Sequence, residues 1–154
     1  MSAKSDLLQR IRDTLQAQLE RLSQAAKEAH DAATDPGSKA EGKYDTRSLE
    51  ASYLASGQAR QVDEAAEALR LFATLSLPDF ELDDAIDAGA LVELDIDDEP
   101  VHYLLVPAAG GLTIEDQGRE ITLLTPASEL YRKLLGCRVG DPLDNPEAMV
   151  TEIS

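Results

Sequence analysis

The chain has few residues whose types and spacing could carry out chemistry. Its single cysteine, Cys137, excludes an intramolecular disulfide and any multi-cysteine metal site, and no histidine lies near it in sequence to make it a nucleophile. His30 and His102 lie far apart and lack the spacing of metal ligands, so we interpret both as structural. No Gly-Lys-Ser/Thr follows Gly110-Gly111, which excludes a phosphate-binding loop. Carboxylates are the remaining candidates.

Three carboxylates lie close together in one short segment: Asp35, Glu41 and Asp45. The run Asp35-Pro36-Gly37-Ser38 ends any helix before it, because Pro lacks an amide donor and Gly permits positive φ. Asp45 or the following Thr46 can cap a helix that begins there. By residue type and position alone, these carboxylates are typical of solvated loop and capping residues.

Helical periodicity flanks this segment on both sides. The first 34 residues contain neither Gly nor Pro, and residues 5–34 have apolar positions in steps of three or four: Leu8, Ile11, Leu15, Leu19, Leu22, Ala26, Ala29 and Ala33. A second helix is expected from Asp45 or Thr46 to about Leu75, with a seam of Ala55, Ala59, Val62, Ala66, Leu69 and Ala73 and with Leu49, Tyr53 and Phe72 alongside it. Similar lengths and a short connection predict an antiparallel coiled-coil hairpin over residues 1–76, with its tip at 35–46.

The pattern changes after Leu77-Pro78-Asp79. Apolar and polar residues then alternate, as they do in half-buried strands. Glu99-Pro100 and residues 115–118 are expected turns, and Ser128 is an expected helix cap. The expected elements are strands at 90–96, 101–106, 119–125 and 149–153 and a short helix at 129–135. Residues 77–154 are therefore predicted to form a small α+β sheet domain.

The charge of the chain is large and uneven. Thirty acidic residues against 14 basic ones give a formal net charge of −16. Residues 1–75 hold 10 Lys/Arg and 12 Asp/Glu, whereas residues 76–154 hold 4 and 18. The large net negative charge excludes direct binding to duplex nucleic acid, because the release of counterions from phosphates needs clustered Lys and Arg. The acidic half suits either a basic protein surface or simple solubility.

No membrane segment or signal peptide is expected. No apolar run approaches the about 18 residues that span a bilayer, and the first ten residues contain no uninterrupted apolar stretch. We therefore expect a soluble, cytoplasmic protein without a membrane partner.

The run Thr125–Asp141 resembles a motif of the Gre family (GreA/GreB type) of bacterial transcription elongation factors. That family also has the order of helical hairpin and then sheet domain. The resemblance covers nearly the whole chain, most strongly residues 88–141. The matching residues in the run are Ser128, Leu130, Arg132, Leu134, Leu135, Gly136, Gly140 and Asp141.

The resemblance implies a sheet domain of the FK506-binding-protein type and a partner, bacterial RNA polymerase. In the family, the hairpin enters the secondary channel of the polymerase, and tip carboxylates help to hold Mg²⁺ while the polymerase cleaves backtracked RNA. The factor is not itself an enzyme, and it has no cofactor of its own beyond this shared Mg²⁺. Mg²⁺ prefers hard oxygen ligands, and here the candidate ligands are Glu41 and Asp35. The resemblance also implies partner-binding roles for four residues: Tyr44, Asp45, Ser128 and Arg132.

The chain departs from the family pattern in several places. Ser38 stands where the family has its tip Asp, and Glu41 is one residue out of the family spacing. The docking motif is Ala127-Ser128-Glu129 instead of Ser-Pro, and Pro142 and Pro146 leave little room for a final hairpin. Three hypotheses stay open: a regulator that stimulates transcript cleavage, one that occupies the channel without cleavage, and a helical-hairpin adaptor that does not bind polymerase.

Overall fold

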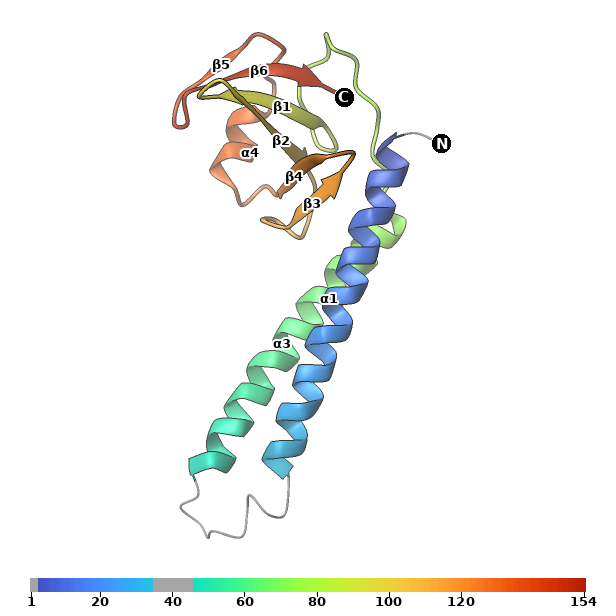
Figure 1. Ribbon diagram of the computed structural model, residues 1–154, viewed down its shortest axis with the longest axis vertical. Coiled ribbons are helices and arrows are strands. Elements are labelled where there is room, and N and C mark those ends of the chain that lie inside the picture. Colours follow the sequence, from blue (N-terminus) through green and yellow to red (C-terminus); the bar gives the residue numbers. More distant parts are fainter. Residues whose placement is uncertain (1–2, 35–45) are drawn as a thin grey trace. The chain divides into compact units, whose positions relative to one another are not determined.

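Two long helices form where the sequence shows helical periodicity. A computed structural model describes residues 3–34 and 46–154 of the chain, with side chains for 3–32 and 57–154 (Figure 1). Helix α1 spans Ala3–Thr34 and helix α3 spans Thr46–Thr74, each within two residues of its expected bounds. No described helix is both long enough and apolar enough to cross a membrane.

The chain divides into two compact units. Residues Arg12–Ala73 form the helical unit, and Met1–Ile11 together with Thr74–Ser154 form the sheet unit. The first turns of α1 thus belong to the sheet unit, and the domain boundary expected at residues 76 and 77 stays a prediction.

In the helical unit, residues 12–34 of α1 run antiparallel to α3 (Figure 1). The Arg12 guanidinium, near the start of this stretch, donates from Nε to the Phe72 carbonyl oxygen near the end of α3, at 2.6 Å. Leu15, Ala65 and Phe72 are buried. The seam otherwise consists of half-buried apolar side chains: Leu19, Leu22, Ala26, Ala29, Val62, Ala66 and Leu69.

The expected seam of α3 was wrong at two positions. Ala59 and Ala73 are exposed, whereas Phe72, which was expected only alongside the seam, is fully buried. The physical reason is size, since stabilisation by burial grows with the apolar area removed from water, and a Phe ring removes far more than an Ala methyl group.

The sheet unit contains one mixed six-stranded sheet in the order β3-β4-β2-β1-β6-β5. Strand β2 pairs with β4 in parallel, and the other neighbouring strands are antiparallel. A helical hairpin before a sheet domain confirms the predicted α+β class. The elements are β1 (Leu91–Ile96), β2 (Glu99–Leu105), β3 (Thr113–Asp116), β4 (Arg119–Leu124), helix α4 (Glu129–Leu134), β5 (Pro142–Leu143) and β6 (Ala148–Ile153).

Three features of the sheet differ from expectation. Strand β3 was not expected, and Glu115 and Asp116 belong to it, so the expected turn at 115–118 is confined to Gln117 and Gly118. The turn between β1 and β2 is Asp97-Asp98, both at positive φ, so Glu99-Pro100 lies in the strand instead. Pro100 is tolerated because it precedes His102, where pairing with β4 begins. A final hairpin also forms: β5 pairs with β6, and Pro142 lies on an edge strand, where its missing amide costs no ladder hydrogen bond.

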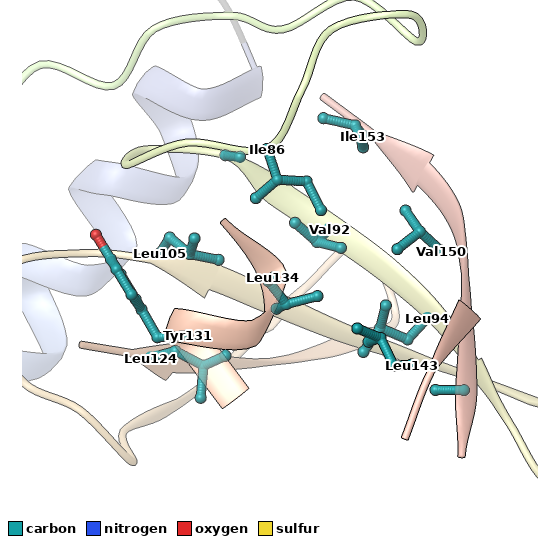
Figure 2. Close-up of a cluster of buried hydrophobic side chains, with 12 residues drawn as sticks. Ile86, Val92, Leu94, Leu105, Leu124, Tyr131, Leu134, Leu143, Val150 and Ile153 are labelled. Carbon is teal, nitrogen blue, oxygen red and sulfur yellow. The ribbon is translucent and has the colours of Figure 1, made fainter. Parts of the chain in front are cut away.

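The core of the sheet unit joins the sheet to α4. In Figure 2, Tyr131 and Leu134 of α4 lie among side chains of the strands. Consecutive side chains of a strand point to opposite faces, and Leu104 and Leu105 of β2 are both fully buried. Both faces at the centre of the sheet are therefore covered. The cluster consists of Ile86, Ala90, Val92, Leu94, Leu105, Leu124, Tyr131, Leu134, Leu143, Ala148, Val150 and Ile153.

Candidate functional site

The structure describes part of the predicted site. The tip residues Asp35, Glu41, Tyr44 and Asp45 lie outside the described residues. Among the side chains that the structure describes, those of residues 3–32 and 57–154, no three or more His, Cys, Asp or Glu are grouped so that they could hold a metal ion. Ser128 and Arg132 are described, and they lie in the segment from β4 to β6 that carries the matched motif.

Ser128 occupies the N-cap of α4, as expected. Its backbone is extended, with φ −79° and ψ 133°, and its amide donates to the Thr125 carbonyl oxygen at 2.9 Å, which closes a turn after β4. The hydroxyl, however, makes no capping hydrogen bond. A serine at this position usually bonds the second or third helical amide, so the Ser128 hydroxyl does not make the hydrogen bond that is typical of its position.

Arg132 lies one turn after Ser128 on α4. Its amide donates to the Ser128 carbonyl oxygen at 3.3 Å, which places the two residues on neighbouring positions of one helical face. The side chain is exposed, and it forms no hydrogen bond or ion pair with any residue that the structure describes. Lys133 differs, because its ammonium donates to the carbonyl oxygens of Asp144 and Asn145, each at 3.0 Å.

Two glycines end this segment in a conformation that disfavours other residues. Gly136 has φ +83° and Gly140 has φ +93°. The Gly136 amide donates to the Ile86 carbonyl oxygen at 2.9 Å, and the Gly140 amide donates to the Val150 carbonyl oxygen at 2.7 Å. The matched glycines therefore hold the chain against β6 and the loop before β1.

Partial burial of Cys137 and burial of Tyr131 disfavour the charged forms of both side chains. Burial raises the pKa of the Cys137 thiol, and the Asp141 carboxylate adds to this effect. The thiolate is the reactive form, so this cysteine is poorly suited to nucleophilic chemistry. Burial, followed by the charge of Asp87, likewise raises the pKa of Tyr131.

The sequence analysis missed a buried ammonium in the sheet unit. Lys4 is 4% exposed and donates to the carbonyl oxygens of Pro78 and Gly89, the latter at 2.7 Å, while its Nζ lies 4.8 Å from the centre of the Phe80 ring. Burial lowers its pKa to about 8, and the Asp79 charge opposes the shift. The one sequence signal is its register, since Lys4 precedes Leu8 by one helical turn and continues the apolar seam, but a lysine at such a position is ordinarily exposed.

A second buried charge lies nearby in the same unit. The Asp116 carboxylate pairs with Arg10 at 3.2 Å and with Arg119 at 3.5 Å. Lys4, Asp116 and Arg119 also line a cavity of about 220 Å³. These contacts attach the first turns of α1 to the sheet, so we interpret them as structural.

Comparisons with known proteins give structural matches only. The chain matches no family model and no curated protein. It is similar to the crystal structure of GreA factor homolog 1 (Gfh1) of Thermus thermophilus, with 23% identity over 93% of this chain and 94% of that chain and a TM-score of 0.37. Gfh1 of Thermus aquaticus gives 23% identity over 92% of both chains, again with a TM-score of 0.37. A further structure of the transcription factor Gfh1 is 24% identical over 92% of this chain and 92% of that chain, also with a TM-score of 0.37. At these identities and scores, the likeness assigns no function to the chain.

Proposed function

We propose that the chain is a regulator of transcription that binds bacterial RNA polymerase through its secondary channel. One observation carries the proposal. The run 125–141 resembles the Gre motif, and its matching residues have distinct places in the structure. Gly136 and Gly140 adopt positive φ, and the exposed Arg132 side chain on α4 forms no ion pair or hydrogen bond with any described residue. The glycines of the run lie where this chain needs positive φ, and the arginine of the run is open to a partner, which supports the proposal.

The charge of the chain supports a protein partner. Residues 76–154 hold 18 acidic and 4 basic residues, and such a surface repels a phosphate backbone. An exposed Arg132 on this acidic background is a distinctive positive group, and its planar guanidinium suits a carboxylate of a protein partner.

Binding to purified bacterial core RNA polymerase tests the proposal. We expect saturable binding that an authentic Gre factor displaces competitively. Ser128→Ala combined with Arg132→Ala should weaken binding at least tenfold, whereas Lys133→Ala is the matched control on the same helix and should bind like the wild type. No binding at saturating polymerase contradicts the proposal and favours the adaptor hypothesis.

Stimulation of transcript cleavage is a finer proposal, which rests on Asp35 and Glu41. Their carboxylates are the ligand type that Mg²⁺ prefers, and a bound Mg²⁺ activates water for cleavage of a phosphodiester. In an assay with backtracked polymerase complexes, Asp35→Ala or Glu41→Ala should abolish stimulated cleavage while binding persists. Asp63→Asn, an exposed acid on α3, is the control. Full cleavage by both tip variants contradicts the ligand assignment, and no cleavage by the wild type indicates a regulator that occupies the channel without cutting.

A further inference from the structure

A second surface of the sheet unit, formed by residues 81–87 and 135–139, has the features of a binding site. Backbone hydrogen bonds join the two segments: the Ile86 amide donates to the Cys137 carbonyl oxygen at 2.8 Å, and the Gly136 amide donates to the Ile86 carbonyl oxygen at 2.9 Å. The Arg138 guanidinium also donates to the Asp83 carbonyl oxygen. We call these residues the 81–87/135–139 surface.

This surface exposes apolar side chains on a fixed backbone. Leu82 is 60% exposed, the highest value among the exposed large hydrophobic side chains that the structure describes. Leu135 and Val139, which are 42% and 40% exposed, belong to the other segment. Their neighbours Ile86 and Leu134 point into the core in Figure 2, so burial anchors both segments. Exposed apolar groups on an anchored backbone are typical of interaction sites.

The turn that presents Leu82 is ordered before any partner arrives. The Glu81 amide donates to Asp84 Oδ2 at 2.8 Å, and the Asp84 amide donates to the Glu81 carbonyl oxygen at 3.1 Å. Both hydrogen bonds close around Leu82 and Asp83. Because these bonds already fix the backbone of the turn, a partner that binds Leu82 orders little additional backbone, which favours this residue as a contact point.

The charges around Leu82 define what it can bind. Residues 79–87 contain five acids and no Lys or Arg: Asp79, Glu81, Asp83, Asp84 and Asp87. Arg138 is the one basic residue of the 81–87/135–139 surface, and its guanidinium is already bonded to a carbonyl oxygen. A second copy of this chain would bring acids against acids, which costs binding energy. The complementary surface is therefore basic and has an apolar pocket at its centre.

We infer that the 81–87/135–139 surface is a second contact with RNA polymerase, where Leu82 enters an apolar pocket rimmed by Lys or Arg. This inference rests on the proposed function, because the polymerase is the partner that it assigns. The contact through Ser128 and Arg132 lies on α4, with Ser128 at its N-cap and Arg132 in its last turn, whereas this second contact is centred on Leu82 in the loop before β1. Leu82 supplies the buried centre of the contact, and Glu81 and Asp83 supply its charged rim.

Two pairs of variants test the inference in the binding assay with purified core polymerase. Leu82→Ser should weaken binding about tenfold or more, whereas Met149→Ser, at a side chain that is 49% exposed on β6, should stay within about twofold. Glu81→Gln with Asp83→Asn removes two rim charges and should flatten the dependence of binding on salt. Asp97→Asn with Asp98→Asn removes two charges at the β1–β2 turn and is the control, since Asn also tolerates positive φ.

The outcomes separate this inference from the proposed function. If the wild type binds polymerase and Leu82→Ser binds equally well, the second contact is wrong and the proposed function stands. If Met149→Ser weakens binding as much as Leu82→Ser, the effect is not specific to this surface and the inference also fails. If the wild type does not bind polymerase at all, both the proposed function and the second contact are overturned.

Discussion

The two units of the chain bury apolar residues in different ways. In the sheet unit, side chains from the strands, α4 and the preceding loop form one cluster, in which residues such as Leu134 are fully enclosed. In the helical unit, burial follows a narrow seam in which many positions are alanine or half-buried leucine. The sheet unit therefore spreads its stabilisation over many residues, whereas the helical unit depends strongly on a few large ones, above all Phe72.

The largest expected effect tests this dependence. Phe72→Ala should lower the free energy of unfolding by about 3–5 kcal/mol, because it leaves a cavity where the ring was fully buried. Urea unfolding followed by circular dichroism at 222 nm measures the loss. Leu71→Ala is the control at the next position, where the side chain is 42% exposed, and it should change stability by no more than about 0.5 kcal/mol. Equal losses of stability in Phe72→Ala and Leu71→Ala would contradict the view that the buried seam residues stabilise the helical unit more than exposed ones.

The matching change in the sheet unit is Leu134→Ala. We expect a loss of about 2–5 kcal/mol, since this side chain has 0% exposure in the cluster of Figure 2. Leu135→Ala removes the same groups from an exposed position and should stay within about 0.5 kcal/mol. A loss well below that of Phe72→Ala would sharpen the comparison, because it would mean that the larger cluster compensates for one missing side chain.

A buried charge distinguishes the sheet unit further and gives a dependence on pH. Because the pKa of Lys4 falls from 10.5 to about 8, the unfolded chain binds more protons than the folded chain between these values. Stability from this group should therefore rise with pH from about 8 to 10.5 and be constant below 8. Relative to Lys4→Met, the wild type should gain on the order of 3 kcal/mol over this range.

Urea unfolding at a series of pH values measures this difference. In an Asp79→Asn background, the rise should begin at a lower pH, because the carboxylate that supports the charged ammonium is gone. A difference between wild type and Lys4→Met that does not change with pH would contradict the buried charge.

The smallest expected effects have opposite signs in the two units. Gly140→Ala should cost about 1–2 kcal/mol, because φ is +93° and nothing near the site would otherwise obstruct a Cβ atom. Gly57→Ala, within α3, should stabilise the chain by about 0.5–1 kcal/mol, since alanine favours the helix. Thermal unfolding of both variants measures the difference. If both substitutions changed the stability in the same direction, backbone conformation would not explain why glycine occupies these two positions.

Most element bounds followed from local sequence patterns. Both long helices and the strands around Val92 and Ile121 were predicted closely, because periodicity and the positions of Gly and Pro are local properties. The turn at Asp97-Asp98 was missed because Asp adopts positive φ less often than Gly, so its presence is a weaker signal of a turn. The parallel pairing of β2 with β4 is a choice among tertiary partners that no local pattern specifies.

The candidate site was predicted less completely than the fold. The cap position of Ser128 follows from residue type, but the absence of a capping bond depends on the surrounding structure. Lys4 was missed because a lysine in an apolar register is ordinarily exposed, and only carbonyl oxygens from residues far along the chain make its burial tolerable. Asp35 and Glu41 lie outside the described residues, so their roles stay predictions.

The sheet order also matters while the chain is being synthesised. Strand β1 is hydrogen-bonded on one side to β2, its near neighbour in sequence, and on the other side to β6, with Val92 opposite Ile153. Until the ribosome has released β6, β1 presents an unpaired edge whose core-facing residues are already apolar. An unpaired edge of this kind can pair with other nascent chains, so the hydrogen bonds from β6 also protect β1 from pairing between chains.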